Sequence, residues 1–284
     1  MAEKLKSMQL RAPAKINLSF QILSRRQDGF HEIETVMAPI SLYDEITLTA
    51  FDEPGEIRFR CDDPTLPSGD DNLAVRAARL FLREARLQTG ISIELKKRIP
   101  HGAGLAGGSS DAATVLLGMN QLFEIGLTTN QMASLAAQLG SDVPFFIFQS
   151  AAKCRGRGEI VEPLALPRSL PLLLLKPAFG VPTPWAYGRW KDSRELTAID
   201  YRPQFFADRK FHNDLERPVF EKHLFLAQAK MWLRARAEVG VALMSGSGST
   251  LFAVLRENVS ANDLARRAKA ELDPELWTCA CATL

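Results

Sequence analysis

A glycine-rich segment at residues 99–113 offers the clearest chemistry in the sequence. It places Gly102, Gly104, Gly107 and Gly108 within seven positions and then opens a strongly helical run. Glycine lets the backbone take positive φ and approach a ligand closely, because it has no Cβ. A helix N-terminus directly afterwards supplies unpaired N–H groups and the positive end of the helix dipole. The segment therefore predicts a loop that holds a nucleotide phosphate.

The residues that follow these glycines suit the same role. Ser109, Ser110 and Asp111 are of types that cap helices, and Asp111 is also able to face a magnesium ion held between phosphates. Two better-known phosphate loops are excluded. No second strand ending in an acidic residue follows, as a dinucleotide fold requires, and Gly108 stands where a P-loop has its lysine. A glycine-rich turn that only caps a helix is the alternative.

Three other polar segments each have a functional and a structural interpretation. Lys15 and Asn17 lie two apart on an expected strand, so their side chains leave the same face, which on a lone strand is usually solvated. Asp142 follows a helix stop within residues 140–144 and is either a helix cap or a free acid. Residues 246–250, Gly-Ser-Gly-Ser-Thr, form either a flexible hairpin loop or an anion-binding nest.

Hydrophobic periodicity predicts that strands and helices are mixed in the first half of the chain. Alternating apolar residues predict strands, and longer amphipathic runs predict helices. The expected strands cover residues 16–22, 30–37, 46–51, 57–61 and 91–95, and the expected helices cover residues 72–86, 111–123 and 130–139. The strand at residues 91–95 leads directly into the glycine-rich segment.

Prolines at positions 163, 167 and 171 indicate a boundary near residues 160–170. Beyond it the expected order is strand 172–176, helix 215–236, strand 241–245, strand 250–255, helix 261–272 and strand 277–283. This β-α-β-β-α-β order is that of a ferredoxin-like domain. Residues 177–211 are predicted to be irregular.

Composition excludes several classes of protein. The 284 residues suffice for one large or two ordinary domains. A net charge of +2 and a pI near 8.3 are too mild to indicate nucleic acid or a membrane surface as a partner. Four cysteines form no CxxC pair or metal array, which fits a reducing cytoplasm. The longest apolar run is far shorter than a membrane span, and residues 1–11 show no signal or transit peptide.

Several of these segments resemble one family, the GHMP small-molecule kinases related to galactokinase, homoserine kinase and mevalonate kinase. The similar segments are residues 13–18 (PAKINL), 100–113, 140–144 (GSDVP) and 243–249 (LMSGSGS). Within that superfamily, three other segments resemble the kinases of 4-diphosphocytidyl-2-C-methyl-D-erythritol: residues 28–31 (DGFH), 72–77 (NLAVRA) and 181–184 (VPTP). The resemblance extends over residues 12–254.

The resemblance implies ATP-dependent phosphorylation of the tertiary 2-hydroxyl of that substrate, giving the 2-phosphate and ADP in the non-mevalonate isoprenoid pathway. It implies an α+β fold of two domains with the active site in the cleft between them. Residues 1–162 would form an α/β ATP-binding domain of the ribosomal S5 domain 2 type, and residues 163–284 the ferredoxin-like domain. ATP and Mg²⁺ are the implied cofactors. A small-molecule substrate is the implied partner, without nucleic acid or membrane, for a cytoplasmic monomer or homodimer.

The resemblance also implies roles for individual residues. Asp142 matches the catalytic aspartate, which takes the hydroxyl proton, and Lys15 matches the catalytic lysine, which steadies charge on the γ-phosphate. The residues expected at ATP are Pro100, Gly102, Ala103, Gly104, Leu105, Ala106, Gly107, Gly108, Ser109 and Ser110, with Asn72 near the adenine. The residues expected at the other substrate are Asn17, Phe30, His31, Thr183 and Tyr187.

Phe30 departs from the family pattern, which usually has tyrosine at this position. The resemblance implies that this ring would still stack on cytosine, opposite Tyr187, but the hydrogen bond of a phenol would be lost. His31 is expected to hydrogen-bond the base. Two alternatives fit less well. A related kinase or decarboxylase of homoserine or mevalonate would leave these side chains without a base, and a regulatory module that only binds nucleotide would need neither Lys15 nor Asp142.

Overall fold

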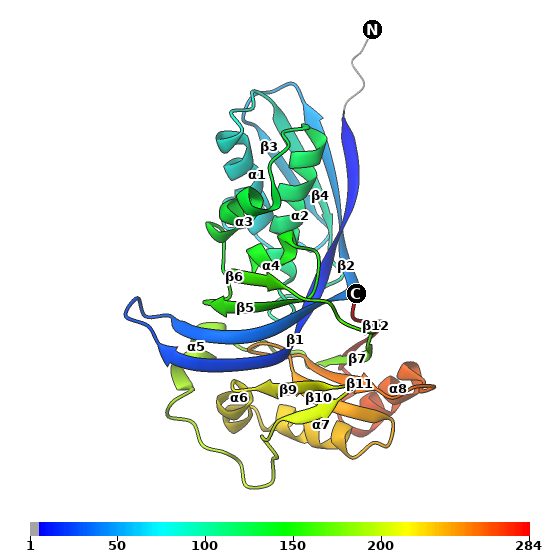
Figure 1. Ribbon diagram of the computed structural model, residues 1–284. Helices are drawn as coiled ribbons and strands as arrows, with labels where there is room; N and C mark the ends of the chain where they lie inside the picture. Colours follow the sequence, from blue (N-terminus) through cyan, green and yellow to red (C-terminus); the bar gives the residue numbers. More distant parts are fainter. Residues whose placement is uncertain (1–5) are drawn as a thin grey trace.

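Two β-sheets form the framework of the protein, and the computed structural model describes residues 6–284 (Figure 1). The larger sheet has the strand order β3-β4-β2-β1-β9-β8, and β5 pairs with β2 and carries β6. Its strands are β1 (Ser7–Arg25), β2 (His31–Phe51), β3 (Ile57–Cys61), β4 (Gly90–Lys96), β5 (Ala152–Gly156), β6 (Ile160–Pro163), β8 (Gln204–Phe206) and β9 (Arg209–Asn213).

The first two strands are unusually long and run from one part of the molecule into the other (Figure 1). Their antiparallel register extends from Ser7↔Thr49 to Arg25↔His31. The register shifts at three places, one of them between Pro13 and Ala14. Such irregularities bend a strand and redirect its side chains. The shift at Pro13 directly precedes the Lys15 position, so it helps to aim that side chain.

Helices cover one face of the larger sheet and bury its apolar side (Figure 1). They are α1 (Leu73–Glu84), α2 (Gly107–Leu122), α3 (Thr129–Ala137) and α4 (Val143–Ile147). Alternating strand residues such as Leu48 and Ile93 pack against Phe81 of α1 and Met119 of α2, and all four are buried. The apolar faces of these helices and strands thus pack together in one core.

The smaller sheet is antiparallel, with the strand order β10-β11-β7-β12. Its strands are β7 (Pro171–Lys176), β10 (Val239–Met244), β11 (Leu251–Leu255) and β12 (Trp277–Ala282), and the helices of this part are α5 (Thr183–Arg189), α6 (Glu216–Lys222), α7 (Leu224–Arg234) and α8 (Ala261–Glu271). The predicted ferredoxin-like order of elements is confirmed. A further apolar cluster joins the sheets, since Ile16 and Ile40 of the larger sheet pack with Leu174 and Phe252 of the smaller one.

Three expectations about the elements were wrong. Residues 177–211 are irregular only in part, because they contain α5, β8 and part of β9. These elements are short, β8 pairs with β9, and β9 pairs with the distant strand β1, which local periodicity does not reveal. The single helix expected at residues 215–236 is interrupted at His223. Helix α2 begins at Gly107 rather than at residue 111, so the last two loop glycines belong to its first turn.

The boundary predicted between residues 162 and 163 coincides with the end of β6. Strand β9 nevertheless joins the larger sheet, through parallel pairing of Ser19 with His212. The division into 1–162 and 163–284 stays a prediction. Within residues 6–284, the helices are all too short or too polar to cross a membrane.

Candidate active site

A cavity of about 990 Å³ gathers residues from both parts of the molecule. Most of the predicted site residues line it: Lys15, Asn17, Phe30, His31, Asn72, Pro100, Gly102, Ala103, Gly104, Ala106, Gly107, Gly108, Ser109, Asp142, Thr183 and Tyr187. Leu105 and Ser110 do not line the cavity, and both side chains are fully buried. The structure therefore brings together segments that are far apart in the sequence.

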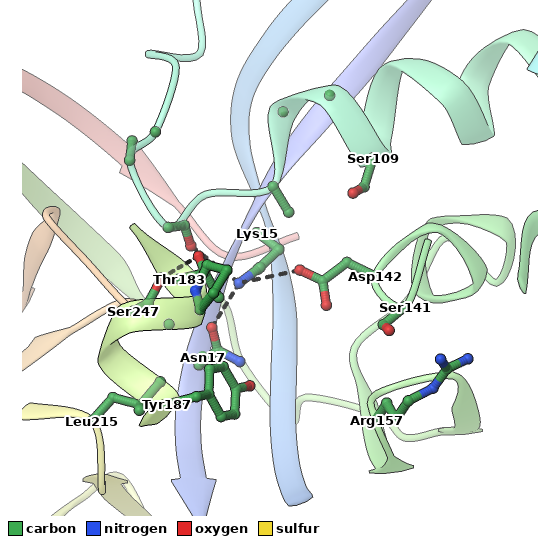
Figure 2. Close-up of a pocket in the computed structure, with 18 of the residues that line it drawn as sticks. Lys15, Asn17, Ser109, Ser141, Asp142, Arg157, Thr183, Tyr187, Leu215 and Ser247 are labelled. Carbon is green, nitrogen blue, oxygen red and sulfur yellow. Dashed lines mark hydrogen bonds and ion pairs between the residues drawn. The ribbon is translucent and has the colours of Figure 1, made fainter. Parts of the chain in front are cut away.

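Lys15 contacts both the acid and the glycine loop (Figure 2). Its Nζ lies 3.9 Å from Oδ2 of Asp142 and donates hydrogen bonds to Oδ1 of Asn17 at 2.7 Å and to the carbonyl of Gly104 at 3.0 Å. Lys15 is only 4% exposed, so the alternative of a solvated strand face is wrong. The loops that meet over β1 bury this face.

A short chain of hydrogen bonds through Asn17 and Thr35 holds the Lys15 side chain in position. The Asn17 amide donates to Oγ1 of Thr35 at 2.8 Å, and the Thr35 hydroxyl donates to the carbonyl of Ser19 at 2.7 Å. Since the Asn17 nitrogen is the donor to Thr35, its oxygen must face Lys15 as an acceptor. The pairing of β1 with β2 thereby orients the ammonium group.

Burial lowers the pKa of Lys15 from its ordinary value, and the nearby charge of Asp142 opposes this effect. Cys154, which is buried on β5, has its pKa raised to about 12 by burial and then by Asp142. The thiol is therefore neutral and supplies no charge of its own. An ammonium in such a water-poor place strongly stabilises negative charge that develops next to it.

Asp142 stands at the N-cap position of α4, but its side chain makes no capping hydrogen bond. Pro144 in the first turn has no N–H to satisfy, which reduces the need for a cap. The Asp142 side chain is 38% exposed and lines the cavity. The carboxylate is thus available to a ligand, and the alternative of a simple helix cap is not supported.

The N-terminus of α2 faces the cavity with unused donors. The first hydrogen bond of the helix joins the Ser110 amide to the carbonyl of Ala106, so the N–H groups of residues 107–109 have no partner within the helix. Ala106 adopts positive φ and provides no side-chain cap. Ser109, Ser110 and Asp111 lie within the helix, after its N-cap position at Ala106, so the expectation that they cap the helix was wrong. Open amides at a helix N-terminus suit a phosphate.

Gly102 and Gly104 of this loop differ in how closely other atoms surround them. Gly102 and Gly104 both have positive φ, +62° and +73°. A Cβ on Gly102 would meet nothing within 4 Å, whereas a Cβ on Gly104 would lie 2.2 Å from the carbonyl oxygen of Ser245. The Ser245 hydroxyl also donates to the Gly104 carbonyl at 2.9 Å. Gly104 therefore permits close contact with the loop of the smaller sheet.

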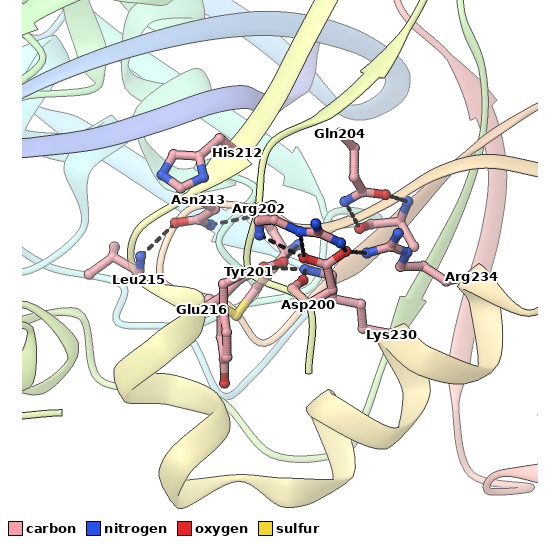
Figure 3. A network of polar contacts seen from close by, with 12 residues as sticks. Asp200, Tyr201, Arg202, Gln204, His212, Asn213, Leu215, Glu216, Lys230 and Arg234 are labelled. Carbon is pink, nitrogen blue, oxygen red and sulfur yellow. Dashed lines mark hydrogen bonds and ion pairs between the residues drawn. The ribbon is translucent and has the colours of Figure 1, made fainter. Parts of the chain in front are cut away.

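That loop, residues 245–250, is fully buried and firmly supported (Figure 3). Nδ2 of Asn213 donates to the carbonyls of Met244 and Gly246 at 2.7 and 2.8 Å. The Met244 amide donates to Glu216, which forms a buried ion pair with Lys230. The alternative of a flexible hairpin loop is not supported. The network instead holds Gly246 against the Lys15 and Asn17 pair.

A buried charge cluster beneath the glycine loop was missed by the sequence analysis. Lys97 pairs with Asp44 and, at 2.8 Å, with Asp111, and all three side chains are nearly inaccessible. Asp44 also accepts the amides of Arg98 and Ile99, which tie the end of β4 to the loop. Burial raises the pKa of Asp111 to about 7, against the opposing charge of Lys97. Spacing alone does not place Asp44 beside residues that follow it by more than fifty positions.

The other end of the cavity carries aromatic side chains. The rings of His31 and Tyr187 lie 5.2 Å apart, and Phe30 is 52% exposed. Burial lowers the pKa of His31, and the charges of Arg25 and Lys191 add to this effect. The imidazole is therefore neutral near pH 7, with one nitrogen donating and the other accepting.

Two predicted residues have partners of their own. Oγ1 of Thr183 lies 2.8 Å from Oγ of Ser247, so α5 is joined to the loop of the smaller sheet. Asn72 caps α1 through the Ala74 amide and donates to the carbonyl of Pro67. Asn72 lines the cavity, but both ends of its amide are already used. Its expected approach to adenine stays a prediction.

Comparison with known proteins identifies the fold and the family. The family model described as the GHMP kinases N terminal domain matches residues 72–150, and that of the GHMP kinases C terminal matches residues 204–273. A homoserine kinase from Cytophaga hutchinsonii has a TM-score of 0.70 at 18% identity, covering 100% of this chain and 96% of that one. This likeness shows that the fold is shared.

More similar proteins define the family more narrowly. A 4-diphosphocytidyl-2-C-methyl-D-erythritol kinase of Methylacidiphilum infernorum is 44% identical over 269 residues, 94% of this chain and 93% of its own. One from Geobacter metallireducens is 40% identical, with 92% and 94% coverage. A crystal structure of 4-(cytidine 5'-diphospho)-2C-methyl-D-erythritol kinase has a TM-score of 0.75 at 37% identity, covering 97% of this chain and 99% of that one. This chain therefore belongs to the 4-diphosphocytidyl-2-C-methyl-D-erythritol kinase family of the GHMP kinases.

Proposed function

We propose that this protein transfers the γ-phosphoryl group of ATP to the 2-hydroxyl of 4-diphosphocytidyl-2-C-methyl-D-erythritol, giving the 2-phosphate and ADP. The observation that carries the proposal is the buried Lys15 beside the uncapped Asp142, in one cavity with the open amides of α2. Binding of a nucleotide alone needs neither a buried ammonium nor a free acid. Phosphoryl transfer uses both, because a proton leaves the acceptor while charge shifts on the phosphates.

Asp142 accepts the proton of the substrate hydroxyl as that oxygen attacks phosphorus. Lys15 lies 3.9 Å from this carboxylate, so a substrate hydroxyl bound to Asp142 lies close to the ammonium, which lowers the pKa of that hydroxyl. The same ammonium stabilises the charge that develops on the transferred group. Asn17 and the Gly104 carbonyl hold Lys15 in place through hydrogen bonds, so little reorganisation is needed during reaction.

The glycine loop holds the triphosphate. The open amides of residues 107–109 at the start of α2 donate to phosphate oxygens, and the helix dipole favours the negative charge. Oxygen ligands also suit Mg²⁺, and Oδ1 of Asp111 is buried without a hydrogen-bond partner in residues 6–284. Ser109 and Asp111 are the residues that would hold Mg²⁺ here. Bound Mg²⁺ would neutralise charge between neighbouring phosphates.

The aromatic end of the cavity recognises the cytosine. Phe30 and Tyr187 supply apolar faces for stacking, and His31 supplies a neutral imidazole for hydrogen bonds to the base. A site built to hydrogen-bond one base leaves polar groups unpaired when another base enters. Thr183, at the start of α5, lines the cavity beside Ser247 and contributes to substrate binding there. A cytoplasmic location and a monomeric or homodimeric state complete the proposal.

Analysis of the product tests the proposal. The purified protein is incubated with ATP, Mg²⁺ and the cytidylated substrate, and ³¹P NMR follows the phosphorus atoms. We expect one new phosphate monoester, on the oxygen of the tertiary 2-hydroxyl group, for each ADP formed. Asp142→Asn should remove this signal while nucleotide binding persists. A phosphate on another hydroxyl, or ADP formation that ignores the substrate, would contradict the assignment.

A further inference from the structure

Arg157 is a cavity-lining residue without a role in the steps above. It lies in the turn between β5 and β6, directly after the last paired residue of β5, since Gly156 pairs with Ile33 of β2. This pairing places the turn beside the start of β2. The guanidinium of Arg157 accordingly lies over the ring of Phe30, 4.9 Å from its centroid.

The donors of this guanidinium are unused by the protein. In residues 6–284 the Arg157 side chain donates no hydrogen bond, and its ion pair with Glu159 is long, at 3.8 Å. Glu159 instead accepts the backbone amide of Arg157 at 2.6 Å. A guanidinium has five N–H donors in a planar fork, which matches phosphate oxygens. An arginine with free donors in a cavity therefore points to an anionic ligand.

The same turn also reaches the reacting end of the site. A Cβ on Gly158 would lie 3.6 Å from Oδ1 of Asp142, so the residue after Arg157 packs against the acid. Figure 2 shows Arg157 and Ser141 on the same side of Lys15 as Asp142. A substrate with its hydroxyl at Asp142 and its base at Phe30 must pass this turn. The turn of Arg157 and Gly158 adjoins both ends of that path, Phe30 through Arg157 and Asp142 through Gly158.

Charges of both signs lie at this end of the cavity. Arg25 and Lys191 line it and are close enough to His31 to lower its pKa. Three carboxylates are also near: Asp192 lines the cavity, Glu159 pairs with Arg157, and Asp28 accepts the Phe30 amide at 3.1 Å. The unused donors of Arg157, and not a net positive charge, therefore point to an anionic ligand.

We propose that Arg157 binds the diphosphate of the cytidylated substrate, with Phe30 as the platform on which its guanidinium stacks. The inference rests on the proposed function and adds a specificity residue for the diphosphate bridge. A phenylalanine suits this task, since cation–π contact needs the ring and not a phenol. Phe30 therefore supports this contact, as a tyrosine at the same position would.

Competition by cytidine and by cytidine diphosphate, at saturating ATP, tests the role of Arg157. Both compounds are measured as inhibitors against the cytidylated substrate in the wild type, R157Q, R157K and the control R155Q. Arg155 lies two residues earlier on β5, pairs with Glu34 and Glu162, and does not line the cavity. We expect R157Q to weaken cytidine diphosphate by about tenfold while leaving cytidine nearly unchanged, as loss of one charge-assisted contact predicts.

R157K should bind cytidine diphosphate more tightly than R157Q but less tightly than the wild type, because lysine keeps the charge but not the planar fork. R155Q should behave as the wild type. The proposal is overturned if R157Q and R155Q bind cytidine diphosphate equally well. It is also overturned if R157Q weakens cytidine as much as cytidine diphosphate, which would indicate a structural role. A wild type that does not use the cytidylated substrate at all would refute the proposed function instead.

Discussion

Gly104 and Gly102 form a matched pair that tests how the two parts of the molecule meet. Alanine at either position places a Cβ on a backbone with positive φ, at +73° and +62°. The substitutions differ in what the new methyl group meets. At Gly104 it lies 2.2 Å from the Ser245 carbonyl oxygen and 3.0 Å from that of Gly248, whereas at Gly102 the space is open.

The difference in stability follows from these contacts. Positive φ costs a residue with a Cβ about 1–2 kcal/mol, and this cost is common to both variants. Overpacking adds about 1–3 kcal/mol at Gly104, because backbone atoms cannot move aside as a flexible side chain does. We therefore expect Gly104→Ala to lose about 2–5 kcal/mol of unfolding free energy, and Gly102→Ala about 1–2 kcal/mol.

Urea unfolding followed by tryptophan fluorescence measures these values, since the chain has four tryptophans. A second consequence concerns activity. The Gly104 carbonyl accepts from both Lys15 and Ser245, so its displacement in Gly104→Ala should also lower turnover. Equal losses of stability in the two variants would refute the proposed contact with the Ser245 loop.

Other predictions concern charge. Asp142→Asn should lower kcat by about a hundredfold or more with little effect on ATP affinity, and wild-type turnover would reduce Asp142 to a structural residue. Because burial lowers the pKa of Lys15, the ammonium persists below that pKa, and kcat/KM should fall as pH rises through it. An alkaline limit at the ordinary lysine value would contradict this. Lys230→Met leaves the charge of Glu216 buried without its cationic partner and should cost about 3–5 kcal/mol in urea unfolding, partly restored by adding Glu216→Gln.

The sequence predicted the parts of the site that depend on local pattern. Two-residue spacing correctly placed Lys15 and Asn17 on one face of a strand, and glycine content with a following helical run located the loop at α2. The burial of Lys15 was not accessible in this way. It results from contact with Gly104 and with the loop near Gly246, which are distant in sequence.

Other parts of the site depend on strand pairing alone. Arg157 reaches Phe30 because β5 pairs with β2, and β5 itself is a strand of five residues that the periodicity did not reveal. The sequence alone suggests that Lys97 is a solvated lysine, because its partner Asp44 lies far away in the sequence, on β2. The sequence pattern thus identifies side chains that are able to react or to bind a ligand, whereas long-range strand pairing determines which of them lie close together.

The most direct test of the central claim compares two acceptors at saturating ATP. Initial rates of ADP release are measured with 4-diphosphocytidyl-2-C-methyl-D-erythritol and with 2-C-methyl-D-erythritol 4-phosphate, which has the same reacting hydroxyl without the cytidine. Stacking on two aromatic faces and hydrogen bonds to the base should favour the cytidylated compound in kcat/KM by about a hundredfold or more. Equal efficiency with both acceptors would contradict a cytidine site at Phe30, His31 and Tyr187.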